Sequence, residues 1–151
     1  MTHAPIVSII IPVFNQWSYT DACLTALSTT IPNDVSHEII VVDNASTDAT
    51  PAGLLSWSSK LANLRVERMS SNTGFSPACN RGAELSTGDY LLFLNNDTVP
   101  LPGWLTPLLE VFKQPDIGLV GPKLISTDTF SINHAGYVFG AGAFYGLYQD
   151  R

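Results

Sequence analysis

Short apolar runs recur along the chain, and stretches with the spacing of amphipathic helices separate them. The runs lie at residues 6–11, 39–42, 64–69 and 90–94, and helical spacing follows the first three at residues 17–29, 50–61 and 76–84. Parallel strands need long crossover connections, which are usually helices. This alternation therefore predicts an α/β fold, Rossmann-like, with a largely parallel sheet and helices on both faces.

Individual runs predict where each strand lies in that sheet. Residues 90–94 are apolar without alternation, which is typical of a strand buried on both faces. Residues 64–69 carry more charge, so we expect that strand nearer an edge. Farther along, the sequence predicts a helix at residues 104–114 and strands at residues 118–121 and 133–139.

Two helices are expected to begin at a hydroxyl residue followed by proline. Thr50 and Ser76 each precede a proline, and this pair suits an N-cap and the first helical position. The sequence therefore predicts that Thr50 and Ser76 cap their helices.

Composition limits the classes of protein and partner. A chain of 151 residues forms a single domain, and its net charge of -6 argues against binding nucleic acid. No run is long enough for a transmembrane segment. Cys23 and Cys79 lack metal-ligand spacing, so we expect reduced core cysteines and a cytoplasmic location, with peripheral attachment to the inner face of the membrane as an alternative.

Polar side chains follow the strand at residues 90–94. Asn95, Asn96 and Asp97 stand where this strand ends. Ligands of open α/β sheets bind beyond the carboxyl ends of the strands, and a carboxylate there suits a hard divalent cation that bridges phosphates. Asn and Asp are also ordinary turn residues, so the segment predicts a site or a turn with equal weight.

Other loops at the same edge supply groups that suit a nucleotide. Asp43 can accept a hydrogen bond from a base or a ribose, and Arg81 can pair with a diphosphate. The alternatives are a turn or capping aspartate at position 43 and an exposed helical residue at position 81. The candidate nucleotide-sugar-binding residues are Pro12, Phe14, Asn15, Asp43, Asn44, Asn80, Arg81, Asn95 and Asn96, and the candidate metal ligand is Asp97.

Phosphate-binding glycine motifs of other folds do not account for these residues. The sequence contains neither the phosphate-loop pattern nor G-x-G-x-x-G. Residues 140–146 come nearest, but their glycines have the wrong spacing and do not open a helix. A dinucleotide-binding fold of the dehydrogenase type is therefore disfavoured.

Several motifs, in order, resemble those of family 2 glycosyltransferases. They are residues 7–15, 40–48, 72–75 with 80–82, and 95–98 with Pro100, while residues 120–124 and 134–136 resemble the rhamnosyl and polysaccharide transferases of that family. The resemblance implies an inverting enzyme of GT-A fold that uses a nucleotide-diphosphate sugar donor and Mg²⁺ or Mn²⁺. By motif position, Pro12, Phe14 and Asp43 would line the base and ribose pocket, Arg81 would lie near the nucleotide, and Asp97 would bind the metal.

Two features depart from the family pattern. Asn95 stands where the family often has its first Asp, which leaves Asp97 as the single carboxylate of that element. The family's catalytic base lies in a later acidic motif, which we expect beyond Arg151. Asp128 and Asp150 match no such motif. His134 suits a core or loop-ordering role better than the role of a base.

These departures predict that residues 1–151 are the donor-binding part of one GT-A domain, truncated on the C-terminal side. We expect a glycan or lipid-linked acceptor, no sugar transfer by this chain alone, and self-association through the apolar tail at residues 135–148. The alternative is a non-catalytic nucleotide-sugar-binding or scaffolding module. A nucleotidyltransferase fits less well, because no glycine-rich basic loop follows the first strand.

Overall fold

The structure, a computed structural model, describes residues 6–126, 129, 131–134, 137–140 and 143–146. The chain divides into two compact units, Met1–Pro102 and Gly103–Arg151. None of the helices in the described ranges is both long and apolar enough to cross a membrane.

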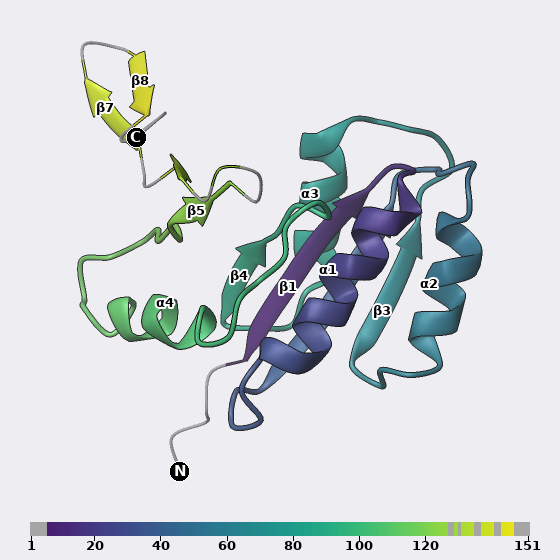
Figure 1. Cartoon of the computed structure of the whole chain (residues 1–151), viewed down its shortest axis with the longest axis horizontal. Coiled ribbons are helices and arrows are strands. Elements are labelled where there is room, and N and C mark those ends of the chain that lie inside the picture. The colour runs from purple at the N-terminus through teal and green to yellow at the C-terminus, as the bar shows by residue number, and fades with distance from the viewer. Residues whose placement is uncertain (1–5, 127–128, 130, 135–136, 141–142, 147–151) are drawn as a thin grey trace. The chain divides into compact units, whose positions relative to one another are not determined.

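A four-stranded parallel sheet forms the centre of the first unit (Figure 1). The strands lie in the order β3 (Leu64–Arg68), β2 (His37–Asp43), β1 (Val7–Val13) and β4 (Tyr90–Phe93). In β1, Ile9 pairs with Ile39 of β2 on one side and with Leu92 of β4 on the other. The predicted α/β fold with a parallel sheet is confirmed, and so is the edge position of β3.

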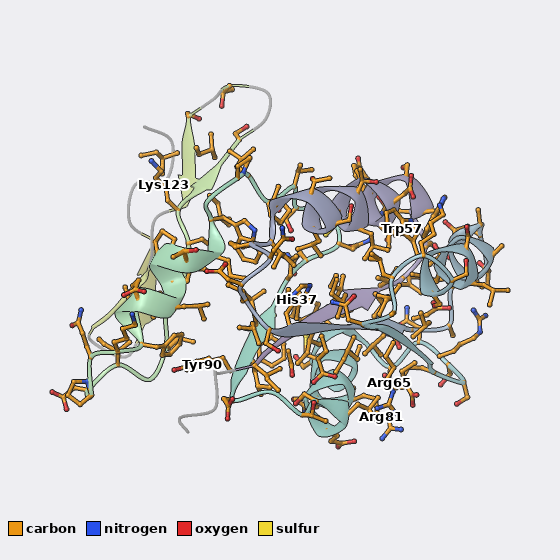
Figure 2. All side chains as sticks on the ribbon, turned by 90° about the horizontal axis from the view of Figure 1, so that it is seen from below. His37, Trp57, Arg65, Arg81, Tyr90 and Lys123 are labelled. Atoms are coloured by element: carbon orange, nitrogen blue, oxygen red, sulfur yellow. The ribbon has the colours of Figure 1, made fainter. Side chains whose placement is uncertain are left out.

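Helices cover both faces of this sheet. Figure 2 shows α1 (Trp17–Thr30) above the sheet and α3 (Phe75–Leu85) below it, while α2 (Thr50–Ser58) connects β2 to β3. The α3 face packs on the side of the sheet that carries Ile10 and Val42, where Gly82 approaches both side chains. All of β1 is buried, because it lies between two other strands and between two layers of helix.

The two predicted helix caps are wrong in detail. At α2 the N–H of Thr50 donates to Asp48 Oδ1 (3.0 Å). The side chain that accepts a hydrogen bond at the start of this helix is therefore that of Asp48 and not that of Thr50. The other helix begins at Phe75, one residue before Ser76, and Gly74 is its N-cap. Gly74 has a φ of 92°, which glycine adopts without the strain of a β-carbon. The chain therefore turns into α3 earlier than the hydroxyl-proline pattern predicts.

Strand β4 lies at an edge of the sheet and is not buried on both faces. Its burial alternates, and Leu91 and Phe93 are 46% and 51% exposed. Within the described chain β4 pairs with β1 alone, so the prediction of a doubly buried strand is wrong. An unbroken apolar run does not identify the position of a strand, because position depends on pairing between distant segments.

The second unit contains α4 (Leu105–Val111) and two antiparallel strand pairs. The pairs join β5 (Leu124–Ile125) to β6 (Ile132–His134) and β7 (Tyr137–Gly140) to β8 (Ala143–Gly146). The helix predicted at residues 104–114 is present but shorter. Residues 118–121 are irregular, so the strand predicted there is wrong, and β6 and β7 occupy most of the region predicted as a strand at 133–139. Asp128 and Asp150 lie outside the described residues.

Candidate functional site

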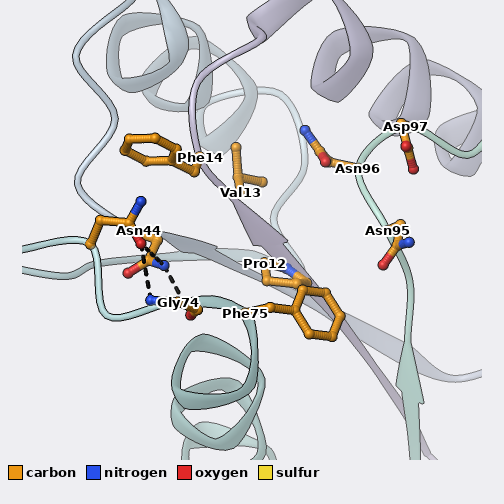
Figure 3. Close-up of a pocket in the computed structure, with 10 residues that line it drawn as sticks. Pro12, Val13, Phe14, Asn44, Gly74, Phe75, Asn95, Asn96 and Asp97 are labelled. Carbon is orange, nitrogen blue, oxygen red and sulfur yellow. Dashed lines mark hydrogen bonds between the residues drawn. The ribbon is translucent and has the colours of Figure 1, made fainter.

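A pocket of about 380 Å³ lies at the carboxyl ends of β1, β2 and β4 and at the start of α3. Parallel strands bring these ends together at one edge, which is where open α/β sheets bind ligands. Figure 3 shows ten residues that line the pocket. They are Pro12, Val13, Phe14, Asn44, Asn72, Gly74, Phe75, Asn95, Asn96 and Asp97.

Two aromatic rings lie near the end of β1. Pro12 and Val13 are buried, whereas Phe14 and Phe75 are exposed to solvent. Figure 3 shows the Phe14 ring near Val13 and the Phe75 ring near Pro12. Exposed aromatic rings beside a buried strand end give the pocket two apolar surfaces that suit a planar group.

Asn15 holds two loops together instead of lining the pocket. Its Oδ1 accepts hydrogen bonds from the N–H groups of Thr47 (2.8 Å) and Asp48 (3.4 Å), and its own N–H donates to Ser46 Oγ (2.7 Å). Asn15 and Ala45 have φ values of 59° and 65°, which are uncommon for residues other than glycine. Local strain of this kind persists only where surrounding bonds impose it, and here the cross-loop bonds do so.

Asn44 lines the pocket with its carboxamide fully engaged. It is 4% exposed, and its Nδ2 donates to Asn72 Oδ1 (2.9 Å) and to the carbonyl of Gly74 (3.0 Å). Its Oδ1 accepts from the N–H of Thr73 (3.0 Å) and from its hydroxyl (3.3 Å). A carboxamide has two N–H groups and one oxygen with two lone pairs, so all its bonding capacity is used within the protein.

Asp43, at the end of β2, is buried and is not among the residues that line the pocket. Its side chain is 1% exposed, Oδ1 accepts from the N–H of Ser46 (2.8 Å), and Oδ2 pairs with the guanidinium of Arg68. Arg68 also donates through Nη2 to the carbonyl of Ser46 (2.9 Å). These contacts match the turn aspartate that the sequence left open, and contact of Asp43 with a base or ribose stays a prediction.

The segment after β4 is both a turn and a wall of the pocket. The N–H and hydroxyl of Thr98 donate to the carbonyl of Asn95 (3.2 and 2.6 Å), which closes the turn. Asn96 Nδ2 donates to Thr20 Oγ1 of α1 (3.0 Å), so its oxygen faces away from that bond. The turn brings Asn95, Asn96 and Asp97 together at the pocket (Figure 3).

The buried thiol of Cys23, in α1, lies next to this turn. Its Sγ is 3.9 Å from the carbonyl oxygen of Asn95. The pKa of Cys23 is raised to about 12, chiefly by burial; a hydrogen bond with Thr98 opposes the rise, and the nearby carboxylate of Asp97 adds to it. The thiol therefore stays protonated at neutral pH and is a structural group instead of a nucleophile.

The oxygen atoms at this end of the pocket fit a hard divalent cation that a ligand helps to hold. Asp97 is exposed and supplies one carboxylate, with the amides of Asn95 and Asn96 beside it. No group of three His, Cys, Asp or Glu side chains in the described ranges could hold a metal ion by itself. Mg²⁺ and similar ions are commonly bound by one or two carboxylates together with phosphate oxygens, so this donor set suits a metal that arrives with a diphosphate.

Arg81 and Asn80 do not line the pocket. Arg81 donates through Nε and Nη2 to Glu67 Oε1 (2.9 and 2.7 Å) and through Nη1 to Glu84 (3.2 Å). These acidic partners, Glu67 first, raise the pKa of Arg81 above its ordinary value. Asn80 is exposed on the same helix. The predicted roles of Asn80 and Arg81 near a nucleotide stay predictions.

Four pocket residues were not among the predicted site residues. They are Val13, Asn72, Gly74 and Phe75. The last three belong to Asn-x-Gly-Phe, in which a glycine with positive φ opens α3. The signal that could have identified them is Asn-x-Gly between a strand and the next helix. This segment lies at the carboxyl ends of the strands, the ligand edge of the sheet.

Comparison with known families gives a match over most of the chain. The model of the family described as Glycosyl transferase family 2 matches residues 8–138. Glycosyltransferase AglE of Haloferax volcanii is 33% identical over 117 residues, which cover 78% of this chain and 38% of AglE.

Solved structures show the same fold. A mannosyltransferase, PcManGT from Pyrobaculum calidifontis in complex with GDP-Man and Mn²⁺, matches with a TM-score of 0.74 and 25% identity, covering 85% of this chain and 38% of that chain. TarS of S. aureus in complex with UDP-GlcNAc matches with a TM-score of 0.54 and 30% identity, covering 60% of this chain and 26% of that chain. This chain thus spans about two fifths of AglE and PcManGT.

Proposed function

The chain belongs to glycosyl transferase family 2, and we propose that its pocket binds a nucleotide-diphosphate sugar with a divalent cation for inverting transfer to a glycan, lipid or other cell-surface acceptor. The resemblance drawn from the sequence motifs is thereby confirmed, as is the GT-A fold. The observation that carries the proposal is the position of Asp97 in a pocket whose other lining residues are apolar or carry side-chain amides.

Asp97 defines the diphosphate end of the proposed site. The protein has a formal net charge of -6 and the described lining residues include no Lys or Arg, so a diphosphate needs a cation to bind there. Asp97 would hold that cation, with Mg²⁺ and Mn²⁺ both suited to its oxygen. When bound, such an ion neutralises the diphosphate that departs as the sugar is transferred. The Mn²⁺ bound with GDP-Man in PcManGT supports this assignment.

The remaining part of the pocket fits the nucleoside. Phe14 and Phe75 offer ring faces, and Pro12 and Val13 offer a rigid strand end beside them. A planar base packs well on such surfaces, because aromatic faces and apolar edges replace the water that the base loses. The sequence prediction that Pro12 and Phe14 line the base and ribose pocket is therefore kept as part of the proposal.

Transfer also needs a general base, and the pocket supplies no second carboxylate. Among the ten lining residues Asp97 is the only one with an acidic side chain. An inverting displacement needs a group that takes the proton of the acceptor hydroxyl as the new bond forms. We propose that residues 1–151 bind the donor and that sequence beyond Arg151 provides the base and the acceptor contacts in the whole protein. The rival is a binding module without turnover.

The free, buried cysteines support a reducing compartment. Cys23 and Cys79 are both buried and unpaired, which is usual for cytoplasmic proteins. We propose that the transferase works in the cytoplasm, at the inner face of the membrane when its acceptor is lipid-linked.

A titration with a matched variant tests the proposal. UDP and GDP are titrated by calorimetry into the wild type, into Asp97→Asn and into Asp116→Asn, each with and without Mn²⁺. Asp116 is exposed and is not one of the lining residues, so its variant removes one charge without altering the lining. We expect Mn²⁺ to strengthen nucleotide binding by about tenfold or more in the wild type and in Asp116→Asn, and to have little effect in Asp97→Asn.

Two results would count against the proposal. Absence of UDP and GDP binding in the wild type would contradict the proposal that the pocket binds a nucleotide. Equal affinity with and without Mn²⁺ would contradict the proposed role of the cation. A radiolabelled-donor assay then separates enzyme from module. Transfer by the whole protein but not by residues 1–151 supports the division proposed above, and absence of transfer by both supports the module.

A further inference from the structure

Asn72 is an exposed side chain of the pocket whose carboxamide is held in one orientation. Its Oδ1 accepts from Asn44 Nδ2 (2.9 Å) and from the N–H of Gly74 (3.0 Å). A flipped amide would place its NH₂ against two donors, so these bonds fix which end is oxygen. The NH₂ group is therefore directed away from the loop.

No described residue accepts a hydrogen bond from Asn72 Nδ2. The residue lines the pocket and is exposed, so this donor is accessible to a ligand. An NH₂ group has two N–H donors and no acceptor capacity. At this position the pocket selects for an acceptor oxygen or nitrogen and against a donor.

Asn44 is what holds Asn72 in place. It is 4% exposed, and its four side-chain hydrogen bonds reach Asn72, Thr73 and Gly74. None of its bonding capacity remains for a ligand, and its backbone N–H donates to the carbonyl of Val13 (2.8 Å). Asn44 thus ties the ends of β1 and β2 to the loop before α3 and acts as a positioning residue.

We propose that Asn72 is a specificity-determining residue of the donor site, which donates a hydrogen bond from Nδ2 to an acceptor atom of the nucleoside, with Asn44 as its positioning residue. This inference rests on the proposed function, since it names a further contact in the same pocket. The acceptor belongs to the base or the ribose, because Asn72 flanks Gly74 and Phe75 on the α3 side, whereas Asp97 marks the diphosphate end after β4.

Asn72→Asp tests the donor without removing the support. An aspartate oxygen still accepts from Asn44 and Gly74, and a negative charge at the start of α3 is favourable, so the fold should be kept. The two donors toward the pocket, however, become acceptors. Asn33→Asp is the matched control, because it adds the same charge at an exposed position after α1 that is not among the residues lining the pocket.

Binding of UDP, GDP and pyrophosphate with Mn²⁺ is measured for the wild type and both variants. We expect Asn72→Asp to weaken binding of the nucleotide that the wild type binds by about tenfold or more, with pyrophosphate binding changed no more than in Asn33→Asp. Unchanged nucleotide binding in Asn72→Asp, or an equal loss for pyrophosphate, overturns the nucleoside contact. If the wild type binds neither nucleotide, the proposed function fails and this inference fails with it.

A second measurement uses the wild type alone and does not depend on the stability of a variant. In ¹⁵N-labelled protein the side-chain NH₂ signals of Asn72 should shift when UDP or GDP is added with Mg²⁺ and should stay in place with Mg²⁺ and pyrophosphate. The NH₂ signals of Asn44 should broaden or shift much less, since that group bonds only within the protein. Asn72 signals that ignore the bound nucleotide would overturn the proposal.

Discussion

The buried carboxylate of Asp43, at the end of β2, forms an ion pair with the half-exposed guanidinium of Arg68, at the end of β3. The two residues are register partners in neighbouring parallel strands, so their side chains meet at the ligand edge of the sheet. Arg68 also donates to the carbonyl of Ser46, and Asp43 accepts from the N–H of the same residue. The pair therefore fastens the loop after β2 to the neighbouring strand.

Asp43→Ala should lower the free energy of unfolding by about 1–3 kcal/mol, the usual cost of leaving buried polar groups without their partner. The N–H of Ser46 would lose its acceptor, while Arg68 could turn to solvent. Urea unfolding measures the change. Asp34→Ala, at an exposed position, is the control and should change stability by less than about 0.5 kcal/mol. Equal stability of the two variants would show that the Asp43 carboxylate does not support the loop.

Gly82→Ala should destabilise the protein although alanine is the better helix former. A β-carbon at position 82 would lie 2.3 Å from Ile10 Cγ2, and Ile10 is fully buried in the central strand. Overpacking costs about 1–3 kcal/mol, whereas replacing glycine in a helix gains about 1 kcal/mol. Steric overlap should therefore win, and thermal unfolding should detect a lower melting temperature. Gly118→Ala is the control: its β-carbon would meet open space, so the melting temperature should stay nearly unchanged. A melting temperature of Gly82→Ala at or above that of the wild type would contradict the close packing of α3 on β1.

Glu38 should make stability depend on pH in the acid range. Partial burial raises its pKa, but hydrogen bonds from Ser8 Oγ (2.6 Å) and from the N–H and hydroxyl of Thr87 (2.7 and 2.9 Å) outweigh burial and hold the pKa below its ordinary value. A carboxyl whose pKa is lower in the folded state stabilises the fold above its unfolded pKa, and this contribution disappears as the pH falls through the folded value.

Glu38→Gln should therefore be less stable than the wild type near neutral pH, and the difference should shrink as the pH falls below the ordinary pKa of a glutamate and then through the lowered pKa of Glu38. Urea unfolding at a series of pH values measures it. Glu110→Gln removes an exposed carboxylate that pairs with Lys113 and should show almost no difference at any pH. A difference at Glu38 that is constant with pH would show that charge plays no part.

Local patterns predicted the elements of the first unit better than their positions. The apolar runs at residues 6–11 and 39–42 predicted two strands, and these are β1 and β2, the inner strands of the sheet. The run in β4 looked the same, yet Leu91 and Phe93 are exposed at an edge. Strand order depends on which distant segments pair, and a run of apolar residues holds no information about its partner.

The ligand edge could be predicted, whereas the contacts within it could not. Asn95 to Asp97 were expected at this edge because the end of a parallel strand is a known place for ligands, and they line the pocket there. The pairing of Asp43 with Arg68 escaped prediction, since the two residues lie 25 positions apart and meet only through strand register. The motif at residues 72–75 includes Asn72, but the bond from Asn44 that orients its carboxamide could not be predicted from that motif.

The central claim is that a metal-nucleotide complex binds in the pocket at the ends of β1, β2 and β4, with the metal at Asp97. Paramagnetic broadening by Mn²⁺ in ¹⁵N-labelled protein with GDP or UDP locates the metal directly. The account predicts the strongest broadening at the backbone amides of Asn95, Asn96 and Asp97, weaker broadening at Phe14 and Phe75, and none at Lys60, which lies beyond α2 outside the pocket. Broadening centred on any other part of the chain, or none in the presence of bound nucleotide, would contradict it.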